Sequence, residues 1–312
     1  MRHDLAFLFP GQGSQRIGML SDAAGAFPIV QETFEEASEA LGYDLWALTQ
    51  TGEAETLNLT EYTQPALLCA SVAIWRAWLA ADGVKPGAIA GHSLGEFSAL
   101  CCSGVLPLAD AVRLVRERGR FMQTAVPVGE GAMAAVLGLD DEQVVSICES
   151  VASGVVEAVN FNSPGQVVIA GQTAAVDSAI AMLKEAGAKR AMPLPVSAPF
   201  HTSLMTPAGE KLQVVLDELQ LNAPEIPVVH NVHAATESDP AVIRELLVKQ
   251  ISSPVRWTAC MTTLREQGAT SFAECGAGKV LGGLVKRMDR SLACASLEAP
   301  DDLQAAVEQF AA

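Results

Sequence analysis

The sequence GHSLG at positions 91–95 constrains the fold more than any other stretch of the chain. An apolar run that ends at Ala90 precedes it and predicts a short buried strand, and residues 94–102 behind it are rich in helix formers. A strand that turns sharply into a helix through G-x-S-x-G presents its serine as a nucleophile. The glycines permit the tight turn, and the free N–H groups of the helix start favour developing negative charge. We therefore predict a nucleophilic Ser93; the alternative is a turn in which Ser93 only caps the helix.

Composition bounds the class of protein. The chain has 312 residues, of which 50% are hydrophobic and 18% charged, so it can bury one large core or two unequal ones. The apolar run 5–9 stops at Pro10, too short for a secretory or membrane-spanning segment, and we expect a cytoplasmic protein. The cysteines are odd in number and lack C-x-x-C spacing, which predicts neither a disulfide framework nor a metal site: Cys69, Cys101, Cys102, Cys148, Cys260, Cys275 and Cys294.

The formal net charge is -16, which disfavours nucleic acid or an anionic membrane as a partner. An acidic partner would need a local basic patch. Two clusters offer one, and the alternative is that both are merely solvated faces: Lys184, Lys189 and Arg190, and Lys279, Lys286, Arg287 and Arg290.

Short apolar runs alternate with long helical patterns over most of the chain. This alternation predicts an α/β layer structure with a mainly parallel sheet, like that of the α/β-hydrolases. We expect strands at 5–9, 87–91, 226–230, 270–274 and 292–296, and helices at 28–41, 65–81, 94–103, 107–124, 203–220, 240–250, 257–267 and 300–311.

The stretch from 131 to 194 breaks this rhythm and predicts the order β-α-β-β-α-β of a ferredoxin-like unit. The expected elements are strand 131–137, helix 140–151, strand 155–160, a turn at 162–165, strand 166–170, helix 173–186 and strand 189–194. We therefore expect a large α/β catalytic domain, 1–126 and 199–312, with an inserted ferredoxin-like small domain, 127–198. A cleft between the two would be a natural ligand site.

A serine nucleophile needs a base, and the chain offers five histidines. We expect His92 to point to the other side of the turn. His201 follows a proline-fixed loop at the edge of the predicted small domain, where a catalytic side chain is easily presented to a cleft, and it is our candidate. His230, which follows a strand, is the main rival. No Asp or Glu stands where a conventional triad would need it between Ser93 and His201.

A second glycine-rich loop, PGQGSQ at 10–15, directly follows the first predicted strand. Such a loop lies at the carboxyl end of its strand, where α/β sheets bind ligands, and it could donate a backbone N–H to an oxyanion. It lacks the G-x-G-x-x-G spacing and the lysine of a phosphate-binding loop.

Taken together, six motifs in order resemble the malonyl-CoA:acyl carrier protein transacylase family over almost the whole chain. They are GQGSQ at 11–15, GHSLGE at 91–96, RGRFM at 118–122, NFNSP at 160–164, VSAPFH at 196–201, and Gln250 ahead of PVRW at 254–257. Ser253 and Ala277 replace the asparagine and the proline that the family pattern leads us to expect, and we read both as local loop variation.

The resemblance implies an S-malonyltransferase in which Ser93 is acylated by malonyl-CoA. His201 would be the base, oriented by the backbone carbonyl of Gln250 in place of an acid. The backbone N–H groups of Leu94 and Gln12 would form the oxyanion hole. The acyl group would then pass to the phosphopantetheine thiol of acyl carrier protein, so the enzyme needs no permanently bound cofactor and no metal.

The resemblance also implies that Arg118 binds the free carboxylate of the malonyl group, with Gln12, Phe200 and Asn162 among the substrate-binding residues. A guanidinium can hold a carboxylate through two parallel hydrogen bonds. Phe200 would crowd a branched acyl unit, or it is simple loop packing. We expect a monomer that serves fatty-acid synthesis.

Three alternatives stay open at this point. A serine hydrolase or thioesterase would use water as the acceptor, and a catalytically silent subunit would only bind carrier protein. A malonyltransferase of a polyketide or malonate decarboxylase system would share the same residues. If the chain does bind carrier protein, we expect Lys189, Arg190, Lys286 and Arg287 to form the docking rim.

Overall fold

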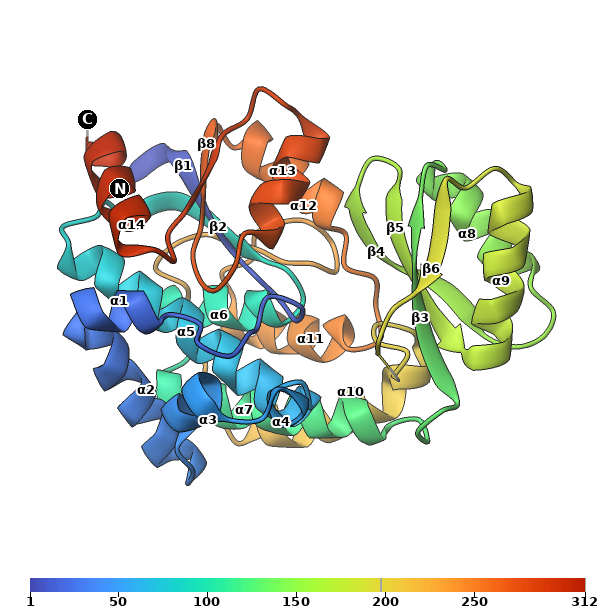
Figure 1. Ribbon diagram of the computed structural model, residues 1–312, viewed down its shortest axis with the longest axis horizontal. Coiled ribbons are helices and arrows are strands. Elements are labelled where there is room, and N and C mark those ends of the chain that lie inside the picture. The colour runs from blue at the N-terminus through green and yellow to red at the C-terminus, as the bar shows by residue number, and fades with distance from the viewer. Residues whose placement is uncertain (197, 312) are drawn as a thin grey trace.

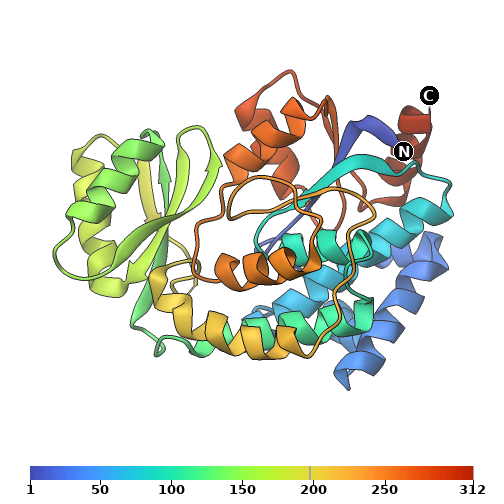
Figure 2. The same ribbon diagram turned by 180° about the vertical axis from the view of Figure 1, so that it is seen from behind.

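The structure is a computed structural model that describes residues 1–196 and 198–311. It consists of two lobes, each built on its own β-sheet and joined side by side (Figure 1). The view from behind shows the same division (Figure 2). Ser197, which belongs to one of the six motifs, and Ala312 lie outside the described residues.

The large lobe carries a five-stranded sheet in the order β7-β2-β1-β8-β9, and every pair of neighbours is parallel. This confirms the predicted parallel α/β sheet. Its strands are β1 (Arg2–Phe9), β2 (Pro86–Gly91), β7 (Val228–Val229), β8 (Ser271–Glu274) and β9 (Cys294–Ser296).

Both faces of this sheet are covered by helices, and the sequence of β1 shows why. Leu5, Phe7 and Phe9 join the larger core on one face, while Ala6 and Leu8 join a second core on the other. Successive side chains of a strand point to opposite faces, so an unbroken apolar run needs helices on both sides. The larger core includes residues of α2, α5, α6 and α7, and the second core includes residues of α12 and α13.

The helices of the large lobe are α1 (Ser21–Ala26), α2 (Pro28–Leu41), α3 (Leu45–Thr51), α4 (Ala54–Leu57), α5 (Thr60–Ala80), α6 (Leu94–Cys102), α7 (Leu108–Thr124), α10 (Thr206–Asp217), α11 (Pro240–Gln250), α12 (Trp257–Glu266), α13 (Val280–Met288) and α14 (Pro300–Ala311), with a 3₁₀ turn at Ser203–Met205. None of the described helices is both long and apolar enough to cross a lipid bilayer.

The small lobe is an antiparallel sheet in the order β4-β5-β3-β6, backed by α8 and α9. With the connection order β-α-β-β-α-β, this strand order is the ferredoxin-like arrangement, as predicted. Its elements are β3 (Gly131–Leu137), α8 (Asp141–Ser150), β4 (Val156–Ser163), β5 (Gln166–Gln172), α9 (Thr173–Glu185) and β6 (Arg190–Pro193). The helices cover one face, and Met133 and Ala170 on the other face join the core of the large lobe.

The structure corrects several expected elements. The turn predicted at 162–165 is shorter, because β4 continues through Asn162 and Ser163. The backbone pairing of β4 with β5 extends through two register irregularities to Ser163, and a tight turn at Pro164-Gly165 suffices. The helix predicted at 203–220 begins as a 3₁₀ turn, and α10 ends at Asp217. Four helices were not predicted, since three of them span seven residues or fewer and the fourth contains two adjacent glycines: α1, α3, α4 and α13.

Candidate active site

Ser93 occupies the turn between β2 and α6 with an unusual backbone conformation. Its φ is 52° and its ψ -107°, a positive φ that costs a side-chain-bearing residue about 1–3 kcal/mol. The flanking glycines are sterically required, because a Cβ on Gly91 would lie 1.9 Å from the carbonyl carbon of Gly95. A Cβ on Gly95 would lie 2.0 Å from the backbone oxygen of Phe9. The turn is therefore the strained strand-to-helix elbow that the sequence predicts.

His201 lies within hydrogen-bond distance of the serine. Its Nε2 is 2.7 Å from Ser93 Oγ, and its Nδ1 is 2.9 Å from the backbone oxygen of Gln250. A carbonyl oxygen can only accept, so Nδ1 carries the proton and Nε2 can accept the serine hydroxyl proton. Burial, reinforced by the positive charge of Arg118, lowers the pKa of His201 to about 3. The ring is therefore neutral near pH 7, the state a general base requires.

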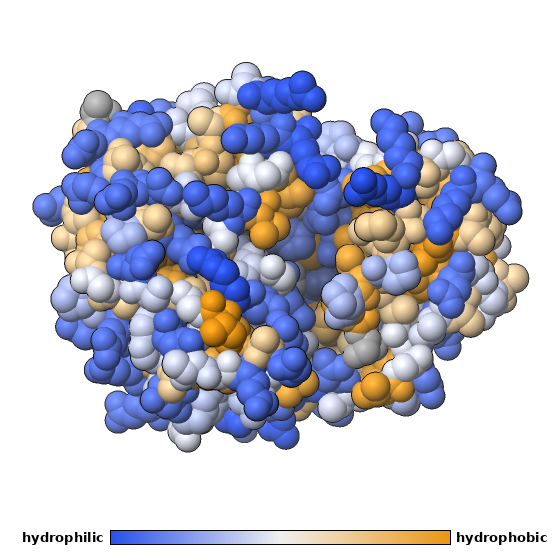
Figure 3. Space-filling view, in the orientation of Figure 1, coloured by the Kyte–Doolittle hydropathy of each residue, from blue (hydrophilic) through white to orange (hydrophobic). Residues whose placement is uncertain are grey.

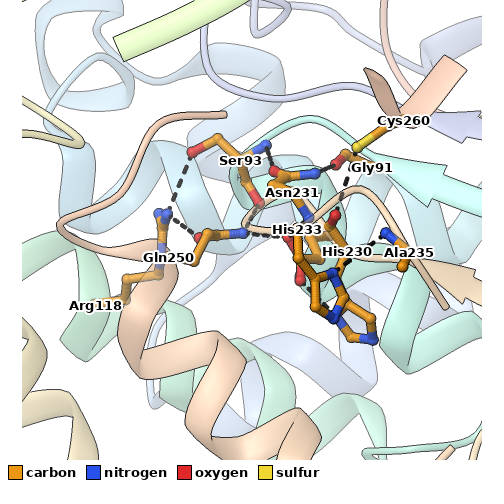
Figure 4. A network of polar contacts seen from close by, with 10 residues as sticks. Gly91, Ser93, Arg118, His230, Asn231, His233, Ala235, Gln250 and Cys260 are labelled. Carbon is orange, nitrogen blue, oxygen red and sulfur yellow. Dashed lines mark hydrogen bonds and ion pairs between the residues drawn. The ribbon is translucent and has the colours of Figure 1, made fainter. Parts of the chain in front are cut away.

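Arg118 extends from α7 towards the same serine, and its side chain is almost fully buried. Its Nη2 donates to Ser93 Oγ at 3.2 Å and to Gln250 Oε1 at 2.8 Å, and its Nη1 donates to Gln64 Oε1 at 2.8 Å. Figure 4 shows the guanidinium beside Ser93 and Gln250. Burial lowers the pKa of Arg118 to about 9, against the opposing effect of Glu96, so the group is cationic at neutral pH. A cation beside the nucleophile can bind an anionic part of a substrate.

Gln250 uses its backbone and its side chain for separate tasks. Its carbonyl orients His201, as stated above, while its side-chain oxygen accepts from Arg118. Its Nε2 donates to the backbone oxygen of Ser93 at 3.0 Å and to Glu96 Oε2 at 2.7 Å. One residue at the end of α11 thus contacts the backbone of Ser93, the ring of His201 and the guanidinium of Arg118.

Asn231 fixes the serine turn and was not predicted from the sequence. It is fully buried, its Oδ1 accepts the backbone N–H of Ser93 at 2.8 Å, and its Nδ2 donates to the backbone oxygen of Gly91 at 2.8 Å. Figure 4 shows Asn231 between these two residues. The N–H of Ser93 is therefore already bonded. Leu94 is the first residue of α6, so its N–H has no acceptor within the helix.

The rival base His230 lies behind the turn. It is fully buried, and its Nδ1 is 2.7 Å from Glu96 Oε1. The same glutamate accepts the backbone N–H of Asn231 at 3.0 Å. Among the hydrogen bonds of the described residues, His201 and not His230 contacts Ser93 Oγ.

A cavity of about 450 Å³ opens in front of the serine, between the two lobes. Figure 3 shows the molecular surface hollowed at this junction. Both lobes contribute to the lining, which includes Gln12, His92, Ser93, Leu94, Arg118, Met122, Met133, Asn160, Leu194, Phe200 and His201. Six of the eight predicted site residues therefore share one cavity, and Gln250 and Asn162 are not among its lining residues. Polar and apolar side chains converge on this concave surface, as they do in a ligand site.

Two predicted residues take positions that the sequence did not define. His92 does not lie away from the site: it is one of the cavity-lining residues, and its ring Nε2 is 2.7 Å from Asn162 Oδ1. Trp257 packs beside the His92 ring, with centroids 5.4 Å apart, and helps to hold it there. Asn162 thus reaches the elbow from the small lobe but is not among the residues that line the cavity.

Comparison with known proteins shows the family to which this chain belongs. The sequence model of the acyl transferase domain family matches residues 6–297. Malonyl CoA-acyl carrier protein transacylase of Escherichia coli K12 is 57% identical over 304 residues, which are 97% of this chain and 98% of the relative. The chain belongs to the malonyl CoA-acyl carrier protein transacylase family. The transacylase of Bacillus subtilis is 45% identical over 97% of this chain and 96% of its own.

Solved transacylase structures share the two-lobed fold. That of the Coxiella burnetii transacylase superposes with a TM-score of 0.98 at 47% identity, covering 99% of this chain and 98% of its own. A malonyl-transacylase in complex with a type II polyketide acyl-carrier protein superposes with a TM-score of 0.97 at 52% identity, covering 98% and 99%. Of the two residues that depart from the transacylase pattern, Ser253 contacts His201 through its backbone, and Ala277 is buried.

Proposed function

We propose that this chain transfers a malonyl group from malonyl-CoA to the phosphopantetheine thiol of acyl carrier protein through a malonyl-serine intermediate. The observation that carries the proposal is the buried Arg118 guanidinium, hydrogen-bonded to the same Ser93 Oγ that faces His201. A nucleophile–base pair alone would serve any acyl group. The cation beside it suits an acyl group with a free carboxylate, as in malonyl.

In the first half-reaction His201 Nε2 accepts the hydroxyl proton of Ser93, and Oγ forms a bond to the thioester carbonyl carbon. The negative charge on the carbonyl oxygen is received by the backbone N–H groups of Leu94 and Gln12, and removal of one such donor typically costs about 3 kcal/mol. The carbon–sulfur bond then breaks, and the proton on His201 passes to the CoA sulfur. The serine is left as a malonyl ester.

The second half-reaction repeats these steps with a new thiol. His201 Nε2 takes the proton of the carrier's phosphopantetheine thiol, and the sulfur forms a bond to the ester carbonyl carbon. The bond from that carbon to Ser93 Oγ then breaks, the proton returns from His201 to Oγ, and the malonyl group leaves as a thioester of the carrier. The carbonyl of Gln250 keeps the imidazole in one tautomer through both halves. In a conventional triad a charged carboxylate accepts this hydrogen bond. Here the neutral carbonyl accepts it and orients the ring in the same way.

Arg118 binds the malonyl carboxylate in this scheme, and Phe200 forms part of the remaining wall. Phe200 lines the cavity, which supports its predicted contact with the acyl unit. Asn162 acts through its contact with His92. Gln12 lines the cavity, and its side chain lies 3.4 Å from Thr60 Oγ1.

Acyl carrier protein, the acceptor, is proposed to dock on the docking rim, which consists of four basic residues. Lys189 and Arg190 are exposed on the small lobe, and Lys286 and Arg287 are exposed on α13 of the large lobe. Positive side chains on both lobes suit an acidic carrier whose prosthetic arm enters between them. Reversal of these four charges should raise the apparent KM for carrier protein and weaken its salt dependence.

The domain limits and the setting are part of the same proposal. We take 1–126 with 199–312 as the catalytic domain and 127–198 as the inserted domain. The malonyl carrier of fatty-acid synthesis is the proposed acceptor. The free thiols of the seven cysteines suit a reducing cytoplasm. A monomer is expected and is checked by light scattering.

A transfer assay with matched acceptors tests the proposal. With malonyl-CoA alone the enzyme should release about one CoA per active site and then stop, since water is a poor acceptor. Addition of holo carrier protein should restore steady CoA release, whereas apo carrier protein, which lacks the thiol, should not. Steady CoA release without carrier would instead support a hydrolase.

A further inference from the structure

Arg118 poses an electrostatic problem that the proposed mechanism does not address. The residue is only 2% exposed, yet each acceptor of its guanidinium hydrogen bonds is neutral: two glutamine side-chain oxygens and one serine hydroxyl. Its Nε has no hydrogen-bond partner among the described residues. A buried cation without a nearby anion is strongly unfavourable, so a compensating charge is expected close by.

Glu96 is the buried carboxylate that approaches this cation through an intermediary. Its side chain is fully buried in the first turn of α6. Gln250 bridges the two charges with one amide: its Oε1 accepts from Arg118 at 2.8 Å, and its Nε2 donates to Glu96 at 2.7 Å. The orientation of this amide is fixed, because a flipped amide would present its NH₂ to the guanidinium and its oxygen to the carboxylate.

The neighbouring His230 does not neutralise the negative charge of Glu96. The Nδ1 of that ring faces Glu96, and its Nε2 is buried without a hydrogen-bond partner among the described residues. A second proton on Nε2 would be a buried, unsatisfied donor on a charged ring. We therefore assign one proton to the ring, on Nδ1, which leaves the carboxylate with its full charge.

We propose that Glu96 is the counter-ion of Arg118, held one amide away by Gln250. The carboxylate is close enough to stabilise the buried guanidinium, and the neutral amide keeps it from occupying the donors that the substrate needs. Glu96 therefore sets how tightly the site holds an acyl carboxylate, which makes it a specificity-determining residue. This inference rests on the proposed role of Arg118.

The charge count gives the direction of the effect. Arg118 and Glu96 together carry no net charge in the free site, and an acyl carboxylate brings the total to one negative charge. With glutamine at position 96 the free site carries one positive charge and the occupied site none. Removal of the carboxylate should therefore strengthen the binding of a free carboxylate, whereas a loss of site geometry would weaken it.

The size of the effect follows from the separation of the charges. Two hydrogen bonds of 2.8 and 2.7 Å and the width of one amide separate the guanidinium from Glu96 by roughly 8 Å. We take the substrate carboxylate to lie slightly further from Glu96 than the guanidinium does. At an effective dielectric constant of about 20, loss of the repulsion between Glu96 and this carboxylate then raises its affinity about tenfold.

The test compares binding of malonyl-CoA and acetyl-CoA by isothermal titration calorimetry in a Ser93→Ala background, in which no acyl-enzyme forms. The CoA part is common to both ligands, so the ratio of the two Kd values reports the free carboxylate alone. Glu96→Gln should raise the preference for malonyl-CoA about tenfold, and Glu96→Asp, which keeps the charge, should leave it within threefold of the parent. Glu274→Gln is the matched control, because Glu274 is also a buried carboxylate but caps α13.

The outcomes separate this inference from the function it rests on. If the Ser93→Ala parent shows no preference for malonyl-CoA, the role proposed for Arg118 is wrong. If the parent prefers malonyl-CoA but Glu96→Gln leaves the ratio unchanged or lowers it, the counter-ion assignment is wrong. Should Glu96→Gln not fold, Gln250→Glu places a carboxylate directly on Arg118 and should abolish the preference; a retained preference would overturn the inference.

Discussion

Replacement of Arg118 by methionine separates substrate choice from folding. Arg118 donates three hydrogen bonds, and its loss leaves the oxygens of Gln64 and Gln250 without that donor. An unsatisfied buried acceptor costs about 1–3 kcal/mol, but removal of a buried charge offsets part of this. We expect a net loss of about 1–3 kcal/mol in the free energy of unfolding, and each kcal/mol lowers the Tm by roughly 2–4 °C in a chain of this size.

The effect on transfer is larger and selective. Two charge-assisted hydrogen bonds to the malonyl carboxylate contribute about 1.5–3 kcal/mol each, so kcat/KM for malonyl-CoA should fall by roughly 10²- to 10⁴-fold. Acetyl-CoA makes no such bonds, and its kcat/KM should change far less. The assay measures kcat/KM for both thioesters with holo carrier protein, with Arg118→Lys as the variant that keeps the charge but loses the paired donors. A malonyl-to-acetyl ratio within threefold of the parent would refute the reasoning.

Three further perturbations test other parts of the account. Because the pKa of His201 lies near 3 in the folded chain and near 6.5 when unfolded, its neutral ring contributes stability fully above about pH 6.5, and that contribution is lost as the pH falls towards 3. Protonation of His201 should accordingly not lower kcat/KM above pH 5. In Arg118→Met the fall of kcat/KM at acid pH should begin at a higher pH than in the parent. A fall centred at pH 6.5 in the parent enzyme would contradict this. Gly95→Ala should be severely destabilised in thermal melts by the Cβ contact, while Gly25→Ala in α1, with open space around it, should be neutral or stabilised by about 1 kcal/mol, and equal Tm values would argue against a strained elbow. Phe200→Ala should raise kcat/KM for methylmalonyl-CoA relative to malonyl-CoA, and an unchanged ratio would leave Phe200 as loop packing.

The sequence predicts the sheet and the elbow well because their signals are local. The apolar strand before Ser93 and the glycines around it are adjacent in the chain, and steric exclusion at Gly91 and Gly95 is a local requirement. The ferredoxin-like order was equally visible, since each of its strands and helices carries its own periodicity. The short helices α3 and α4 were missed because fewer than two full turns give no readable period.

The hydrogen-bond network around Ser93 could not be predicted from local sequence signals. Asn231 and Gln250 lie 138 and 157 positions beyond Ser93, and only tertiary folding brings them to it. Glu96 gave one usable signal, an acidic residue within the apolar first turns of α6. Glu96 is also the last residue of the GHSLGE motif, and an acid that is buried among apolar neighbours needs a polar partner. The orientation of His92 was missed because Asn162, which holds it, comes from the other lobe.

The central claim is that Ser93 holds a malonyl group until a thiol takes it, and intact-mass spectrometry tests it most directly. After mixing with malonyl-CoA, the protein should gain the mass of one malonyl group, located on Ser93 by peptide mapping and absent from Ser93→Ala. The adduct should persist in buffer and disappear when holo carrier protein is added, with the same mass gained by the carrier. An adduct that is lost to water at the same rate with or without carrier, or one that forms equally well in Ser93→Ala, would contradict the account.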